Sequence, residues 1–239
     1  MKKERDLTSG NITSGLWAFA VPLMLGNVIQ QFYNLADTWI VGRYIGNIGL
    51  AAVGSSYTLM TFLTYIIIGL CLGNSTFISM EYGKKNIEKI RNGIYISFVM
   101  ILAVTVGIII IFYGFLDEII KMLQVPKDTV ADMKVYLVYV FIGFFATFIY
   151  NYISNVLRAI GNSVIPLIFL GVSVVLNVFL DILFVAVLKM GIMGAAVATV
   201  ISQYISALGT FGYYFFQYPQ LKVRKSDIKW NKSNFKSIL

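Results

Sequence analysis

The sequence predicts an all-α integral membrane protein built as a six-transmembrane-helix bundle. Six apolar segments of at least 20 residues follow one another, separated by short polar stretches, and about 20 apolar residues in a helix are enough to cross the hydrocarbon core. Hydrophobic residues make up 58% of the 239 residues and charged residues 13%, against about 25% charged in ordinary soluble domains. The expected spans are residues 14–42, 51–79, 92–116, 131–157, 163–187 and 191–217.

Lysine and arginine are distributed unevenly between the two sets of loops. If the N-terminus is placed inside, the inner segments hold 14 of the 19 basic residues and the outer segments hold 5. Cytoplasmic loops carry such an excess, so we expect a multi-pass protein of the cell inner (plasma) membrane with both termini cytoplasmic. Residues 1–13 are then a cytoplasmic segment, 14–217 the six-helix lobe and 218–239 a basic tail or inter-lobe linker. The net charge of +8 indicates contact with anionic membrane lipid and not nucleic-acid binding.

The inventory of side chains excludes several kinds of site. The chain has no histidine, which excludes imidazole proton relays, histidine-dependent metal sites and catalytic triads. Its one cysteine, Cys71, lies inside an apolar segment, so no intrachain disulfide can form. No small-x-small cleavage pattern ends the first apolar segment, so we expect an uncleaved first helix.

The first span carries a stripe of polar side chains. At about 100° per residue, they share roughly one third of the helix circumference: Asn27, Gln30, Gln31, Asn34 and Asp37. A carboxylate in the middle of a membrane costs on the order of 2.5–3.5 kcal/mol on insertion scales, so the stripe is expected to face protein or a wet cavity. Pro22 removes a backbone hydrogen bond in the same helix and favours a kink there.

The later spans differ in polarity. Residues 51–79 are rich in the small and hydroxyl side chains that suit close helix contacts, and residues 92–116 are nearly all aliphatic and are expected to meet lipid. Each of the last three spans places polar residues on one face: Tyr136, Thr147, Tyr150, Asn151, Ser154 and Arg158, with Asn155 at the edge; Ser173, Asn177 and Asp181; and Thr199, Gln203 and Ser206. With the first span, this gives four helices with an inward polar face, as expected of a bundle that encloses a wet chamber.

The first and fifth spans resemble each other. Each contains one acidic residue, Asp37 or Asp181, and the only other acid within the expected spans is Asp132, at the very start of the fourth. In both copies an Asn precedes the Asp, and a Gly-x-x-Gly and an Ala-Ala-Val follow it: Asn34, Gly46, Gly49 and Ala51 in one, and Asn177, Gly191, Gly194 and Ala195 in the other. Internal duplication is common in transporters, with sites at the repeat interface. Chance, or the demand for Gly and Ala at helix contacts, is the alternative.

Taken in order, several motifs resemble those of the multidrug and toxic compound extrusion (MATE) family of secondary transporters. They are PLMLGN at 22–27, LADT at 35–38, GLAAVG at 49–54, LRAIGN at 157–162, LNVFLDI at 176–182 and GIMGAAVAT at 191–199. The resemblance implies two six-helix lobes around a central cavity, exchanging Na⁺ or H⁺ for small organic cations or drugs. Family members have about twice this length, so the chain resembles the N-terminal lobe: a truncated product, an engineered half, or a subunit that pairs with a second lobe or self-associates.

The resemblance also implies a cation site. Its residues would be Asp37, Asn177, Asp181 and Thr199, holding H⁺ or Na⁺ as the coupling ion, with no other cofactor. The surrounding hydrogen-bond network or substrate cavity is expected to include Gln31, Asn34, Tyr136, Asn151 and Asn155. Two carboxylates in a low-dielectric pocket need a proton or a cation between them, so an occupied site can change its packing while an empty one cannot, and Pro22 is the expected hinge.

Three alternatives to ion-coupled efflux remain open from the sequence. An intramembrane aspartyl protease would also place two Asp on two helices, but it carries Gly-x-Gly-Asp, whereas Asp181 follows Val-Phe-Leu; we therefore expect no enzyme. A lipid-linked oligosaccharide flippase of the same superfamily would need several cationic residues in its cavity, and only Arg158 lies near a span. A non-transporting membrane interaction partner is the third alternative.

Overall fold

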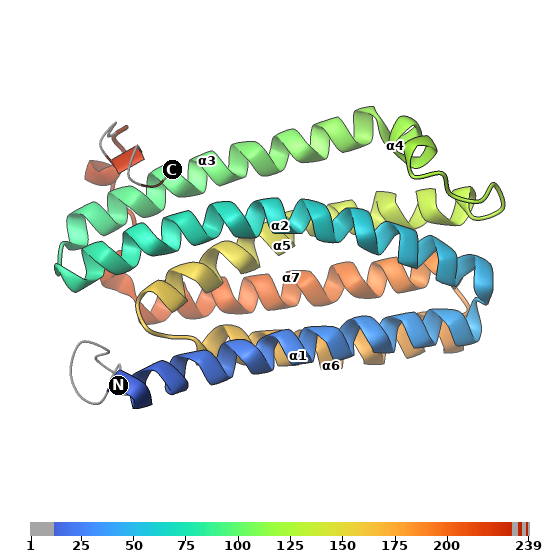
Figure 1. Ribbon diagram of the computed structural model, residues 1–239, viewed down its shortest axis with the longest axis horizontal. Helices are drawn as coiled ribbons and strands as arrows, with labels where there is room; N and C mark the ends of the chain where they lie inside the picture. The colour runs from blue at the N-terminus through green and yellow to red at the C-terminus, as the bar shows by residue number, and fades with distance from the viewer. Residues whose placement is uncertain (1–11, 231–233, 236–237, 239) are drawn as a thin grey trace.

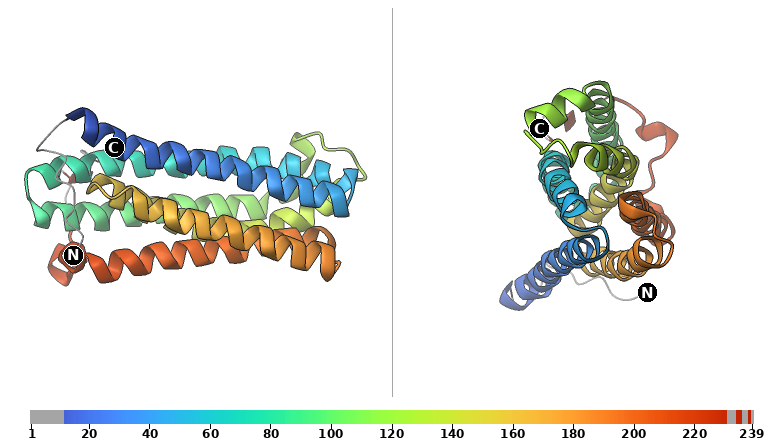
Figure 2. Two further views of the ribbon diagram at one scale, coloured as in Figure 1. Left: turned by 90° about the horizontal axis from the view of Figure 1, so that it is seen from below. Right: turned by 90° about the vertical axis from the view of Figure 1, so that its right-hand side faces the viewer.

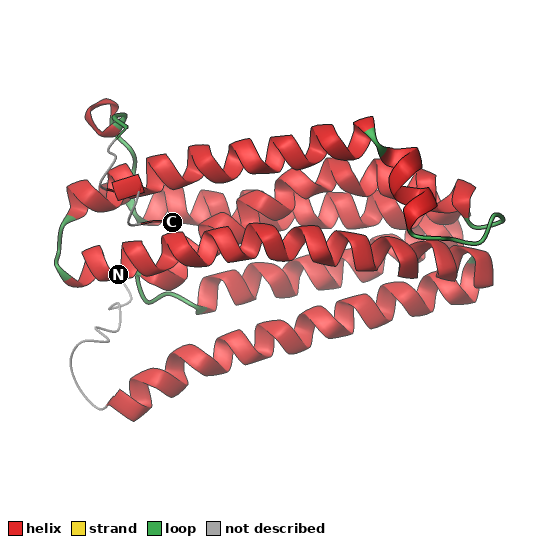
Figure 3. Cartoon of the chain, turned by 45° about the horizontal axis from the view of Figure 1, so that its top comes forward, coloured by secondary structure: helices red, strands yellow, loops and turns green. Residues whose placement is uncertain are grey.

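The computed structural model describes residues 12–230, 234–235 and 238, and it is a bundle of long helices (Figure 1). Within this part of the chain, six helices are long and apolar enough to cross a membrane, which confirms the predicted fold class. They are α1 (Ile12–Tyr44), α2 (Asn47–Gly83), α3 (Ile87–Gly114), α5 (Val130–Ala159), α6 (Val164–Asp181) with its π-helical continuation η1 (Ile182–Val187), and α7 (Gly191–Gln217). The loops lie at the two ends of the bundle (Figure 3).

The bundle is centred on α5 and α7. These two helices have the largest buried share, and α1 has the smallest. The core along α5 is aromatic: Phe141, Phe144, Phe148 and Tyr152 are all almost completely buried, and Phe112 of α3 stacks on Phe141. Helix α1 packs against α6 and α2 at the edge of the bundle, as the end-on view in Figure 2 shows. One long face of α1 is therefore left without a neighbour.

The structure extends α1, α2, α3 and α5 beyond the expected boundaries and adds elements that hydropathy did not predict. Helix α2 continues to Gly83 and includes Glu81, which is buried and bonds to Lys84, so Asp37 and Asp181 are not the only acids in the long helices. A short helix, α4 (Leu116–Met122), lies between α3 and α5, and the 3-10 turns η2 (Pro219–Leu221) and η3 (Lys225–Asp227) follow α7. Hydropathy cannot place helix ends that continue into polar sequence, which explains these differences.

The turns of the two helical hairpins, α1–α2 and α6–α7, are built alike. Gly46 and Gly191 both have positive φ angles, 93° and 61°, in the region where glycine avoids steric strain. Gly49 and Gly194 follow each of them by three residues, and a Cβ at either would crowd the residue four positions earlier. The shared Gly-x-x-Gly therefore has the same structural role in both hairpins.

The segment after α7 folds back onto the start of α3. Arg91 Nε donates to Asp227 Oδ2 at 2.7 Å. The Asn92 side chain donates to the Asp227 and Lys229 carbonyls at 2.9 and 2.8 Å and accepts from Asn234 Nδ2 at 2.7 Å. We call this set of contacts the tail clamp. Within residues 218–230, the part around Asp227 and Lys229 is therefore docked against the start of α3.

Charge supports the tail clamp. The Asp227 side chain is only 2% exposed, and burial alone would raise the pKa of this carboxyl. The Arg91 guanidinium and the Arg224 N–H, which donates to Asp227 Oδ2 at 2.8 Å, outweigh burial and hold the pKa below its usual value. The carboxylate is thus the form of Asp227 that fits this site.

Candidate cation site

The two intramembrane carboxylates meet where α1, α6 and α7 pack together. Asp37 of α1 is 6% exposed and Asp181, at the end of α6, is fully buried; the two carboxyl groups lie within interaction range of each other. Asn177 is fully buried one helical turn before Asp181, on the same face. Thr199 is buried on α7, which contacts both α1 and α6. The structure thus places all four predicted site residues at one junction.

Several polar atoms at this junction have no hydrogen-bond partner among the described residues. They are Asp37 Oδ1, both carboxylate oxygens of Asp181, and the amide oxygen and nitrogen of Asn177. Buried polar groups are nearly always satisfied in native proteins, and inside a membrane an orphaned group is especially unfavourable. The junction therefore offers unused oxygen ligands of the kind that bind a proton or a hard cation. No group of three or more Cys, Asp or Glu side chains suited to a metal ion occurs in the described part of the chain.

Two tyrosines face the carboxylate pair. Tyr136 of α5 was expected there; it is 7% exposed and lies within interaction range of Asp37, Asp181 and Thr199. Tyr33 was not expected, and its hydroxyl donates to Thr199 Oγ1 at 3.3 Å. Tyr33 precedes Asp37 by four residues, so the helical spacing could have placed it on the face of Asp37. It was missed because only amides and acids were considered polar in the first span.

Two other predicted residues of α1 lie away from the carboxylates. Gln31 is exposed, and Asn34 donates to the Tyr57 hydroxyl of α2 at 3.1 Å. Asn27 and Gln30 are exposed as well, so the polar stripe of α1 faces outward except at Asn34 and Asp37. Helix α1 runs without a break through Pro22, so the expected hinge is not visible in this structure and stays a prediction.

The predicted amides on α5 bond to their own helix. Asn151 Nδ2 donates to the Thr147 carbonyl at 2.8 Å, and Asn155 Nδ2 donates to the Asn151 carbonyl at 2.9 Å. Ser75 of α2 also donates to the Asn155 carbonyl, at 3.3 Å. Only the Ser75 contact joins α5 to α2, and none of the three includes the carboxylate pair.

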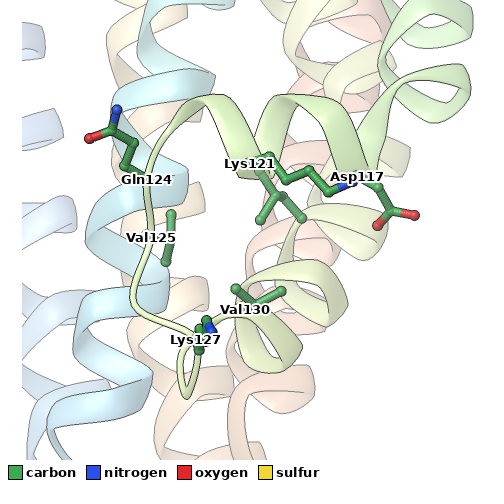
Figure 4. A pocket seen from close by; sticks show the side chains of 7 residues that line it. Asp117, Lys121, Gln124, Val125, Lys127 and Val130 are labelled. Carbon is green, nitrogen blue, oxygen red and sulfur yellow. The ribbon is translucent and has the colours of Figure 1, made fainter.

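A cavity of about 510 Å³ lies at one end of the bundle and not at the carboxylate pair. It is formed by α4, the following loop and the start of α5 (Figure 4). Its lining residues are Asp117, Ile120, Lys121, Gln124, Val125, Lys127 and Val130. The site at Asp37 and Asp181 is thus a packed cluster of polar side chains and not the opening of this cavity.

Comparisons with known proteins agree on one family. The family model described as MatE matches residues 22–183. The chain is 34% identical over 206 residues to "Probable multidrug resistance protein YpnP" of Bacillus subtilis (strain 168), covering 86% of this chain and 46% of that protein. It is 27% identical over 234 residues to "Probable multidrug resistance protein NorM" of Thermotoga maritima, covering 95% and 50%.

Solved structures of this family have the same fold. A crystal structure of a MATE protein in the bent conformation superposes with a TM-score of 0.91 at 25% sequence identity, covering all of this chain and 53% of that chain. An outward-facing multidrug resistance MATE family transporter gives a TM-score of 0.88 at 26% identity, again covering all of this chain and 53% of the other. The chain spans about half the length of the relatives it matches.

Proposed function

Because the chain belongs to the MATE family of membrane transporters, we propose that it acts as one lobe of a secondary transporter that exports drugs or organic cations in exchange for H⁺ or Na⁺. The observation that carries the proposal is the buried pair Asp37–Asp181, with unpaired oxygens, between three helices. The names of the relatives, which are multidrug resistance proteins, support the class of substrate.

The carboxylate pair is the proposed binding site for the coupling ion. Two buried carboxylates repel each other when both are ionised, and a single proton or Na⁺ removes that repulsion. The Asn177 amide oxygen and the Thr199 hydroxyl supply the neutral oxygens that a hard cation requires. Tyr33 and Tyr136 close the site on the remaining side. The loaded site carries one negative charge fewer than the empty site, and that difference couples the ion to a change in packing.

The moving element in this proposal is α1. It contributes Asp37, has the smallest buried share of the long helices, and contains Pro22. When the ion leaves, repulsion between Asp37 and Asp181 weakens the contact of α1 with α6. Because α1 is the least buried of the long helices, this loss is enough to bias its position, and the Tyr33–Thr199 hydrogen bond moves with it.

Transport in this proposal also needs a second lobe, from a longer chain or from another copy. The polar stripe of α1 and neighbouring apolar side chains such as Phe32 and Leu35 are exposed in the lobe. Amide groups facing lipid would be unfavourable, whereas a facing lobe would enclose them in a wet cavity. The relatives are about twice as long, and a two-fold arrangement is the commonest solution for association of copies.

The test measures ion binding without requiring transport. Thermal unfolding of the purified chain is followed in detergent at varying pH and in NaCl against choline chloride. The proteins compared are the wild type, Asp37→Asn, Asp181→Asn and the control Asp117→Asn, which lies in the short helix α4. A ligand that binds only the native state raises Tm, so we expect a shift with Na⁺ or with pH that both site variants lose and the control keeps. If both site variants keep the wild-type shift, the pair is structural and the proposal is wrong.

A further inference from the structure

A second charged group lies inside the long helices, away from the carboxylate pair. Arg158 is half-buried in the last turn of α5, and its Nε is buried without a hydrogen-bond partner. Within the part of the chain that the structure describes, the three salt bridges all involve other residues. A partly buried guanidinium without a counter-charge is unfavourable, so an anion from outside the lobe is the natural partner.

A second unused donor lies on the same face of α5. Ser154 is fully buried one turn before Arg158, and its hydroxyl has no partner among the described residues. Tyr150, one turn earlier again, donates to the Pro166 carbonyl at 3.0 Å. Since Pro166 is in the first turn of α6, this face of α5, with Arg158 on it, packs beside the start of α6.

The start of α6 adds positive potential at the same place. The amino end of a helix carries about half a positive charge from aligned peptide dipoles. The Ser163 side chain makes no capping bond there, while Asn162 Oδ1 caps the Ile165 N–H at 3.3 Å. Val164, the first residue of the helix, is half exposed, at 49%, so this end of α6 lies open to an outside group.

We propose that the corner formed by Arg158, Ser154 and the first turn of α6 is a binding site for a phosphate group. A guanidinium matches the geometry of phosphate oxygens, and a helix amino end binds the same group. The corner lies at the end of the bundle where α7 ends and α1 starts (Figure 1), the end that the lysine and arginine distribution assigns to the cytoplasm. The phosphate can come from an anionic lipid headgroup or from free phosphate. The site does not depend on ion coupling at Asp37.

The experiment titrates three probes against the purified chain in detergent and follows thermal unfolding: phosphatidylglycerol, inorganic phosphate and diacylglycerol, which has no phosphate. We expect phosphatidylglycerol or inorganic phosphate to raise Tm and diacylglycerol to have no effect. A shift with inorganic phosphate alone identifies free phosphate as the source, and a shift with the lipid alone identifies the headgroup; either result supports the site. No shift with either phosphate probe overturns it.

Variants test the residues. Arg158→Gln should weaken binding of the phosphate probe at least roughly tenfold, because it removes a charge-assisted hydrogen bond, and Ser154→Ala should weaken it by less. Arg158→Lys keeps the positive charge but lacks the paired N–H donors of a guanidinium, so it should bind the phosphate probe with intermediate affinity. Lys89→Gln, on an exposed cationic residue of α3, should bind as the wild type does. Equal losses in Lys89→Gln and Arg158→Gln would show general surface charge and overturn the proposal.

A last measurement separates binding from a structural role. Without phosphate, Arg158→Gln should leave Tm unchanged or raise it, because an unpaired charge is removed. A marked fall in Tm without any probe would show that Arg158 has a partner inside the lobe, and the site would then be wrong.

Discussion

Replacing Asn92 by leucine should release the tail clamp while leaving the membrane bundle folded. The Asn92 amide makes three hydrogen bonds, to the carbonyls of Asp227 and Lys229 and from the side chain of Asn234, at 2.7 to 2.9 Å. Leucine has similar volume and no polar atoms, so all three are lost. With a net contribution of about 1 kcal/mol for each bond, tail docking should weaken by about 3 kcal/mol, which corresponds to roughly a hundredfold larger undocked fraction.

Limited trypsin digestion of the full chain in detergent measures this undocked fraction. The tail segment contains Lys222, Arg224, Lys225 and Lys229, and cleavage follows the population of the open form when opening is fast compared with cutting. Cleavage at these positions, identified by mass spectrometry, should be about a hundredfold faster in Asn92→Leu. Gln31→Leu, an exposed amide on α1, serves as the matched control and should be cut at the wild-type rate. If Asn92→Leu and the wild type are cut equally fast, the clamp contributes nothing to docking.

Three further predictions concern the tail clamp, the packing of α2 on α3, and the proposed cation site. The pKa of Asp227 is held below that of a free carboxyl, about 3.9, so the tail clamp should be fully formed above that pH and lost as the pH falls through the lowered value. Amide exchange of residues 224–230 should therefore accelerate only in strong acid. Acceleration already at pH 6 would contradict this pH dependence. Gly93→Val should lower the free energy of unfolding by about 1–3 kcal/mol, because a side chain there meets the ring of Phe77; an unchanged Tm would count against this packing of α2 on α3. Tyr33→Phe should keep the fold but weaken ion binding several-fold through loss of the bond to Thr199; ion-dependent stabilisation equal to that of the wild type would show that Tyr33 has no part in the site.

Hydropathy and helical spacing were sufficient for the six spans and the polar faces of α5, α6 and α7. The residues of the proposed cation site are distributed over 163 positions, from Asp37 to Thr199, and spacing alone could not unite them; the internal repeat and the family resemblance did so. Asn151 and Asn155 share a face with Tyr136, but an amide in a helix can bond to the carbonyl four residues earlier, and these two do so. Their part in the network or substrate cavity, which the resemblance implies, stays a prediction.

The tail clamp could not be predicted because its two sides are about 135 residues apart in the sequence. Arg91 and Asn92 at a helix start, and Asp227 in a basic tail, are individually ordinary features of loops next to a membrane. Only tertiary structure shows that Asn92 satisfies two tail carbonyls at once. The phosphate corner was partly visible, since Arg158 was the one cationic residue near a span, but nothing in the sequence indicated that it would lack a partner.

The two copies of the internal repeat differ in the spacing between the aspartate and the turn glycine. The turn glycine follows Asp37 by nine residues in the first hairpin and Asp181 by ten in the second. An exact copy of α1 would therefore place the second turn one residue out of register. The second hairpin contains the π-helical turn Ile182–Val187 directly after Asp181, with Leu188 N bonded to the Leu183 carbonyl five residues earlier at 2.8 Å. A π-helical turn absorbs one extra residue and commonly occurs at functional sites. The two hairpins thus bring Asp37 and Asp181 together through different local windings, and a strictly symmetric construction of the site would have displaced one of the two hairpin turns.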